Sequence, residues 1–242
     1  MTGIDQPVTA IKGKHCMVSF ANPEQIQIAV KYCQTYTLDN GAFSLWKKEE
    51  KLDLDKLAEW IGEWSRYPNC DWYCLPDVIG GSHDDNALLR SKWFNKVGPD
   101  VWRKGSPVWH FHEPLEVLRD FIKFGAPCVC LGSSAEYSQV GTRFWWARMA
   151  EAMQVLCDDE GFPKVKIHGL RMLDSQIFGQ LPLYSADSTN AARRIGFDQD
   201  WKGVYSPSNK KLRAAVMMDR IESNHAALKW CKQVKIQSDL FF

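Results

Sequence analysis

Short apolar runs alternate with amphipathic segments along most of the chain, and the apolar runs stop at charged or small residues. Runs of this kind predict buried strands, and apolar residues spaced by three and four positions predict helices. The expected strands are 15–20, 36–39, 70–77, 107–112, 127–134, 164–169 and 183–188. The expected helices are 24–33, 52–64, 84–97, 115–124, 142–157 and a short turn at 175–178, followed by a last strand or loop from 204 and a helix over 211–233.

Strand and helix alternate at about thirty residues per unit, which is the size of a β-α-β repeat. No segment has the length and composition of a linker between domains, so the pattern predicts one α/β domain of residues 1–242, with 204–242 as its C-terminal helical part. A closed (β/α)8 TIM-type barrel is the favoured architecture, and an open doubly wound sheet is the alternative.

Composition narrows the classes of protein that this chain can belong to. With 45% hydrophobic residues, 24% charged residues and a formal net charge of +1, the chain is neither disordered nor surrounded by a strong field. Any binding of nucleic acid must therefore depend on a local patch of charge. No apolar run approaches the length of a membrane span, so we expect a soluble protein.

Eight cysteines are spread through the expected strands and helices. We see no secretory leader before them, and this favours reduced thiols in a cytoplasm. The Cys70–Cys74 and Cys128–Cys130 pairs lack the knuckle spacing and the further ligands of a zinc site. We therefore expect neither a metal nor another cofactor.

Polar residues gather where the expected strands end. In a barrel these ends face one pocket, where carboxylates and imidazoles supply acid, base or nucleophile and glycines let the backbone approach a ligand. An aspartate followed by Asn-Gly is also good turn chemistry by itself, so repetition along the chain favours a site. The strand-end residues are Asp39, Asp77, His110, His112, Gly132, Ser133, Ser134, His168, Gly169, Asp187 and Ser188.

In this order, the strand ends resemble those of the tRNA-guanine transglycosylase superfamily. They are most similar to its DNA-modifying branch, the 7-deazaguanine transglycosylases of phages and bacterial islands. The resemblance covers roughly residues 37–195. It is carried by Asp39-Asn-Gly-Ala-Phe-Ser44, Pro76-Asp77, Leu131-Gly132, His168-Gly169-Leu170 and Ala186-Asp187-Ser188-Thr189.

The resemblance implies a barrel that exchanges guanine in a nucleic acid for a 7-deazaguanine. It implies that Asp187 attacks the sugar and that Asp39 handles the ring proton of the base. Asp77 would read the guanine edge, and backbone N–H groups near Gly132 and Ser133 would meet the O6 atom. His110 and His112 stand where the family has a glutamine, so their roles remain open.

The chain lacks the cysteine-rich zinc subdomain of the tRNA enzymes after Asp187, which favours DNA as the substrate. A base inside a duplex must be flipped out, and Phe43, Trp46 or Tyr184 could stack on it. The resemblance is also compatible with a homodimer, and with the host cytoplasm as the location of a phage enzyme. The candidate DNA contacts are Lys47, Lys48, Arg193, Arg194 and the cluster Lys210, Lys211 and Arg213.

Three other functions stay open. An enzyme that only excises the base would use the same residues, with water resolving the intermediate. A metal-dependent barrel hydrolase would use His110, His112 and His168 with an aspartate, since His-x-His on a strand projects both rings to one side. A non-catalytic binding module is the third, but acids crowded in a pocket are costly without a role.

Overall fold

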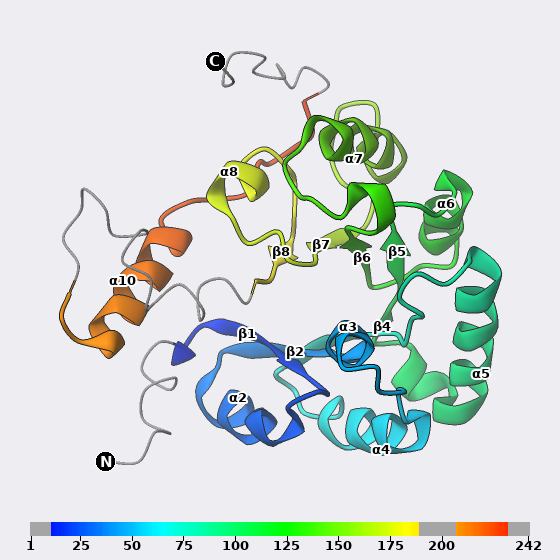
Figure 1. The fold of residues 1–242 in the computed structure, drawn as a ribbon, viewed down its shortest axis with the longest axis horizontal. Helices are drawn as coiled ribbons and strands as arrows, with labels where there is room; N and C mark the ends of the chain where they lie inside the picture. The colour runs from blue at the N-terminus through cyan, green and yellow to red at the C-terminus, as the bar shows by residue number, and fades with distance from the viewer. Residues whose placement is uncertain (1–10, 189–206, 232–242) are drawn as a thin grey trace.

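The computed structural model describes residues 11–188 and 207–231, and within them strands and helices alternate in the expected order (Figure 1). The strands are β1 (His15–Ser19), β2 (Thr35–Asp39), β3 (Cys70–Cys74), β4 (Gly105–Ser106), β5 (Val108–His110), β6 (Cys128–Gly132), β7 (Lys166–Gly169) and β8 (Ser185–Ala186). The α-helices are α2 (Ile26–Tyr32), α3 (Ala42–Lys47), α4 (Leu54–Trp64), α5 (His83–Trp102), α6 (Leu115–Lys123), α7 (Arg143–Leu156), α8 (Ser175–Phe178) and α10 (Lys210–Glu222). Two 3-10 turns, η1 (Pro23–Gln25) and η2 (Ala135–Tyr137), complete the described elements.

The pairings between the eight described strands are all parallel and follow the order of the chain. β1, β2, β3 and β4 form one sheet, and β5, β6, β7 and β8 form the other. Only Pro107 separates β4 from β5, and its carbonyl oxygen accepts a hydrogen bond from the N–H of Cys130 at 2.9 Å. Because proline has no N–H to donate to a ladder, the two sheets read as one layer interrupted at this residue.

The layer of strands is curled, so that side chains of strands distant in the sheet order contact each other on its inner face. The rings of Trp72 on β3 and His168 on β7 are 4.8 Å apart, and the sulfur atoms of Cys74 and Cys130 are 3.9 Å apart. In a flat sheet β3 and β7 would lie about 14 Å from each other, at about 4.8 Å per strand. The predicted α/β barrel class is therefore confirmed for the described residues, and the open sheet is the wrong alternative.

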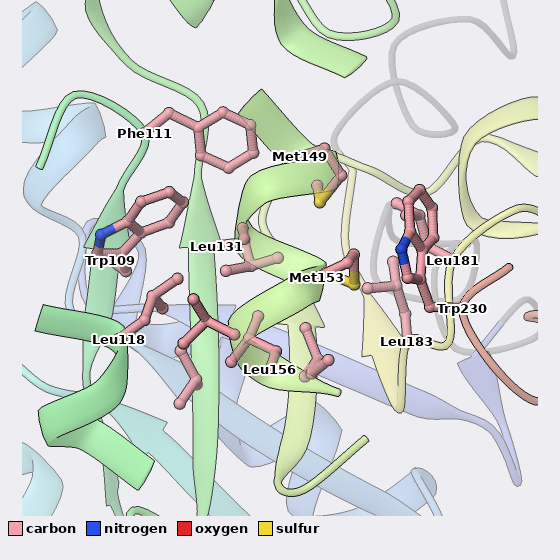
Figure 2. Packing of buried hydrophobic residues seen from close by; sticks show 14 of the residues in the cluster. Trp109, Phe111, Leu118, Leu131, Met149, Met153, Leu156, Leu181, Leu183 and Trp230 are labelled. Atoms are coloured by element: carbon pink, nitrogen blue, oxygen red, sulfur yellow. The ribbon is translucent and has the colours of Figure 1, made fainter. Parts of the chain in front are cut away.

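Hydrophobic side chains fill both sides of the curled layer. Side chains of β1, β3, β5 and β6 meet inside it, together with Leu170 after β7. Outside it, one cluster packs the first strands against α2, α4 and α5, and another packs β5 to β7 against α6 and α7. Figure 2 shows Met149, Met153 and Leu156 on the inner side of α7, near Leu131 of β6.

Capping residues explain where several helices begin. The Asp53 carboxylate accepts hydrogen bonds from two N–H groups in the first turn of α4. Ser82 and Asp85 form a reciprocal capping box at the start of α5, and Asp174 caps α8. Each cap satisfies backbone donors that the first turn of a helix leaves unpaired.

The structure corrects three local predictions. The helix α3, which the sequence pattern did not reveal, follows β2 almost directly. α5 runs on to Trp102 through a break at Gly98, where φ is 73°. The last helix ends at Glu222 instead of continuing to 233, and the side-chain amide of Asn224 donates to the carbonyl oxygen of Arg220 near this end.

The remaining expectations concern the tail, the thiols and the membrane. The start of the expected last strand or loop, 204–206, lies outside the described residues. All eight cysteines are free thiols, and seven of them are at least partly buried. Among the described helices, none combines the length and apolar character needed to cross a membrane.

Leu118 on α6 is fully buried in the outer cluster, so it offers a test of the packing. We expect Leu118→Ala to lower the free energy of unfolding by about 2–5 kcal/mol, because it removes buried methyl groups and leaves a cavity. Urea denaturation measures the change. The matched control is Leu228→Ala, at a leucine that is 87% exposed, which should stay within about 0.5 kcal/mol of the parent. Equal effects of the two substitutions would contradict the described core.

Candidate active site

Three predicted aspartates converge at the carboxyl ends of the strands. Asp39 is the last residue of β2, Asp77 lies in the loop after β3, and Asp187 directly follows β8. The Cys74 thiol lies within the field of all three. Its contact with Cys130 acts to lower its pKa, but burial and the three carboxylates raise that pKa to about 11. The predicted convergence of these acids is therefore what the structure shows.

Asp39 keeps its proton to a higher pH than an ordinary aspartate does. We call the end of the barrel where these three aspartates lie the mouth. Asp39 keeps some accessible surface there, but protein surrounds its carboxyl group, and this burial raises the pKa of Asp39 to about 6. The charges of Asp187 and Asp77 act in the same direction. The hydroxyl of Ser19 on β1 donates to Oδ2 at 2.7 Å and opposes the rise, as does a hydrogen bond from the backbone of Gly41.

The structure explains why asparagine and glycine follow Asp39. Gly41 has a φ of 76°, and a Cβ at this position would lie 2.9 Å from the backbone nitrogen of Ala21. Only glycine adopts this conformation at that distance without strain. The side-chain oxygen of Asn40 accepts from the N–H of Ala42 at 2.8 Å, at the start of α3. The turn therefore links the end of β2 tightly to α3.

Asp77 has a close side-chain neighbour at each carboxylate oxygen. The side-chain amide of Asn40 donates to Oδ1 at 2.7 Å and to the carbonyl oxygen of Leu75 at 2.6 Å. Nε2 of His110 lies 2.9 Å from Oδ2, away from the axis of an ideal hydrogen bond. Burial acts to lower the pKa of His110, but the contact with Asp77 and the charges of Asp77 and Glu113 outweigh it and raise that pKa.

Buried neighbours hold His110 in this position. Its backbone N–H donates to Oε2 of Glu113 at 2.8 Å, and the amide of Asn86 approaches Oε1 of Glu113 at 3.4 Å. Gly132 faces the ring from β6, and a Cβ there would lie 3.3 Å from Nδ1 of His110. Glycine at 132 therefore gives the imidazole its room, a role that differs from the base contact implied by the resemblance.

The second histidine of the pair has other partners. The ring of His112 stacks on that of His110 at 5.7 Å. Its Nδ1 lies 2.8 Å from the hydroxyl of Ser134, and its Nε2 lies 3.1 Å from the carbonyl oxygen of Gly81. A carbonyl only accepts, so Nε2 carries the proton in this arrangement. His112 thus ties the loop before α5 to the loop after β6.

Asp187 has a mixed set of contacts and remains partly accessible. Its Oδ1 accepts the backbone N–H of Arg171 at 2.9 Å and lies 3.3 Å from Nε2 of His168. The other ring nitrogen of His168 lies 2.8 Å from the hydroxyl of Ser185. The N–H of Asp187 donates to the carbonyl oxygen of Gly169 at 3.2 Å. With 24% of its side chain exposed, against 8% for Asp77, Asp187 is the more accessible of these two carboxylates.

Ser133 and Phe43 border the same mouth. The hydroxyl of Ser133 accepts from the indole N–H of Trp145 at 2.9 Å, and its carbonyl oxygen accepts from the Arg171 guanidinium at 3.1 Å. That guanidinium lies 4.2 Å from the centre of the Phe43 ring. A cleft of about 290 Å³ opens beside Asp77; among its lining residues are Ala42, Leu45, Trp46, Val78 and Leu89.

Several residues that the sequence analysis assigned to base stacking or DNA contact lie away from the three aspartates or outside the described residues. Tyr184 contacts Asp71 and Lys166, near the amino ends of β3 and β7, so the proposal that it stacks on a flipped base is wrong. Lys47 and Lys48 are exposed at the end of α3, whereas Arg193 and Arg194 fall outside the described residues.

Sequence reasoning missed four residues of the site: Ser19, Asn40, Glu113 and Arg171. Asn40 lies inside the Asp39-Asn-Gly motif, which indicates a turn but gives no sign of the contact with Asp77. The other three carry no motif, because their positions follow from contacts between elements far apart in the chain. Ser19 alone left a signal, since it lies near the end of an expected strand.

The metal-hydrolase alternative requires the three histidines and an aspartate to bind one metal ion. Their ring nitrogens instead contact Asp77 for His110, Ser134 and Gly81 for His112, and Ser185 and Asp187 for His168. Within 11–188 and 207–231, no group of three or more His, Cys, Asp or Glu side chains is arranged to hold an ion.

Comparisons with known proteins add little to this description. No family model matches the chain, and no curated protein matches it. Among solved structures, a mutant of the tryptophan synthase α-subunit from the hyperthermophile Pyrococcus furiosus aligns over 88% of this chain and 97% of that one. The identity is 9% and the TM-score is 0.44, so this likeness supports no conclusion about function.

The raised pKa of Asp39 gives a test by pH. Because the folded state holds this proton up to about pH 6 and the unfolded chain releases it near its ordinary pKa of 3.8, the folded state should lose stability as pH rises between these values. We expect Asp39→Asn to remove this loss, so that the variant gains stability over the parent from about pH 4 to pH 7. Urea unfolding across this range measures it.

The control for this titration is Asp100→Asn, at a side chain that is 96% exposed. Its stability should follow that of the parent at every pH. A constant difference between Asp39→Asn and the parent would show that Asp39 titrates alike in both states.

Proposed function

We propose that this protein exchanges guanine in DNA for a 7-deazaguanine through a covalent link between Asp187 and the sugar. The observation that carries this proposal is the arrangement of three carboxylates with different surroundings in one mouth. Asp39 has a pKa of about 6, Asp77 lies between His110 and Asn40, and Asp187 is the partly accessible one. The sequence resemblance supplies the reaction, and the cytoplasm is the proposed location.

Asp187 is suited to act as the nucleophile. A carboxylate oxygen attacks C1′ while the bond from C1′ to N9 of guanine breaks, and this splits one difficult displacement into two. The Arg171 N–H and the His168 ring orient the carboxylate through Oδ1. The incoming base then attacks C1′ and releases Asp187, so the configuration at the sugar is retained.

Asp39 is suited to move the ring proton in both steps. As guanine leaves, the protonated carboxyl can give its proton to the departing nitrogen. The resulting carboxylate then takes the N9 proton of the incoming deazaguanine, which restores the starting state. A pKa of about 6 serves both directions near neutral pH, because neither form of the group is rare.

Asp77 is suited to read the base. Guanine and 7-deazaguanines present N–H donors at N1 and the 2-amino group, and a carboxylate offers acceptors to both. Asn40 donates a hydrogen bond to one oxygen of Asp77 and the His110 ring contacts the other, so its orientation is set before a base arrives. Its burial makes the loss of such a pairing costly, which favours selection of the correct base.

The first test is base exchange itself. The protein is incubated with guanine-containing DNA or with unmodified tRNA, each with and without 7-cyano-7-deazaguanine, and nucleosides are identified by mass spectrometry. Deazaguanine in DNA alone is the expected result. Abasic sites without insertion would point to a base-excising glycosylase, and an unchanged nucleic acid in every tube would contradict both reactions.

For the nucleophile, we expect Asp187→Asn to lower exchange by about 10³-fold or more, since the amide cannot form the ester to C1′. The covalent complex with DNA should disappear on a denaturing gel, while unfolding by urea stays close to that of the parent. Asp100→Asn is the matched control and should exchange normally. Persistent exchange in the Asp187 variant would refute this role.

For the base reader, we expect Asp77→Asn to raise KM for free guanine by about 10-fold to 100-fold. The new amide would place an N–H against a protein donor or against the N1–H of the base. The parent should prefer guanine to hypoxanthine, which lacks the 2-amino group, and the variant should lose that preference. Competition between the two bases in the exchange assay measures it; an unchanged preference would exclude Asp77 as the reader.

A further inference from the structure

One aromatic ring beside the mouth carries two cations. The Phe43 ring on α3 has the Lys47 ammonium 4.5 Å from its centre and the Arg171 guanidinium 4.2 Å from it. Trp46 lies on the same helix, with its ring centre 5.9 Å from that of Phe43, and is 55% exposed. We call Phe43, Trp46, Lys47 and Arg171 the cationic rim.

The rim is joined to the proposed nucleophile through Arg171. The same residue donates its backbone N–H to Asp187 and its guanidinium to the carbonyl oxygen of Ser133. Its φ is 61°, in the left-handed region that residues other than glycine rarely adopt. This conformation lets one residue contact the nucleophile through its backbone and the Phe43 ring through its side chain.

The negative charges at the mouth would repel a nucleic acid, so its binding there requires cations nearby. Asp39, Asp77 and Asp187 would repel a phosphodiester strand, and the His110 ring beside Asp77 is buried, with 4% of its side chain exposed. The sequence 47–51, Lys-Lys-Glu-Glu-Lys, has a formal charge of only +1. In the part of the chain that the structure describes, neither Lys47 nor Arg171 forms an ion pair with a carboxylate side chain, so both cations remain available to an external anion.

We propose that the cationic rim binds the DNA strand on either side of the target nucleotide. Arg171 and Lys47 contact its phosphates, and the exposed Trp46 face stacks with a neighbouring base. Single-stranded nucleic acid is commonly held by this pairing of cations with aromatic faces. The inference rests on the proposed function for the identity of the strand, and it adds Arg171, which no sequence motif indicated.

The test measures binding separately from exchange. A short fluorescein-labelled DNA strand with one guanine is titrated with Asp187→Asn protein, which prevents covalent capture, and anisotropy is followed between about 50 and 200 mM NaCl. We expect added Arg171→Ala or Lys47→Ala to weaken binding by about 3-fold to 10-fold. Each should also reduce the slope of log affinity against log salt by about 0.7, as expected when one phosphate contact is lost.

Two further variants sharpen the result. Arg171→Lys keeps the charge and should retain the salt slope of the Arg171 parent. Arg103→Ala removes an arginine that is 78% exposed near the amino ends of the strands, and it should bind DNA as the Asp187→Asn protein does. Urea unfolding confirms that each variant is folded.

Unchanged affinity and salt slope in Arg171→Ala would overturn the proposal. So would a variant that binds DNA normally but loses affinity for free guanine, because Arg171 would then contact the base. If the rim variants lose DNA binding while the parent exchanges no base, the rim stands and the proposed function fails. The two hypotheses can therefore be rejected independently.

Discussion

Three carboxylates lose part of their hydration at one end of the curled sheet, and the site depends on how the protein compensates for that loss. A buried charge is tolerated only where donors, opposite charges or a retained proton offset that loss. Asp39 retains its proton up to about pH 6, Asp77 gains a histidine of raised pKa and an amide donor, and Asp187 keeps contact with solvent and a backbone N–H. Three identical side chains thereby have three different surroundings.

The curvature of the sheet makes these differences possible. Trp72 and His168 meet across the interior, and the small residues at 74, 130 and 132 let opposite strands approach. His110 occupies the room beside Gly132, and its backbone is held in turn by Glu113. The packing below the strand ends therefore determines which carboxylate lies beside the His110 ring.

The same arrangement suits each of the three acids to a different role in the proposed reaction. Asp77, which lies between Asn40 and His110, suits recognition, because an acceptor fixed in advance discriminates between bases. The acid that titrates near neutrality suits proton transfer, and the accessible one suits attack on a sugar. Arg171 connects the last of these to the aromatic and cationic surface of α3.

The sequence by itself determined the order of elements and the strand-end positions of Asp39, Asp77 and Asp187, because hydrophobic periodicity is a local property of the chain. It also indicated the parallel barrel. It could not reveal α3, whose six residues are too few for a periodic signal, or the break at Gly98. The donors that distinguish the three acids were decided only by tertiary structure. Ser19, His110 and Arg171 reach them from separate strands and loops, and a pKa depends on the groups that surround a side chain in space.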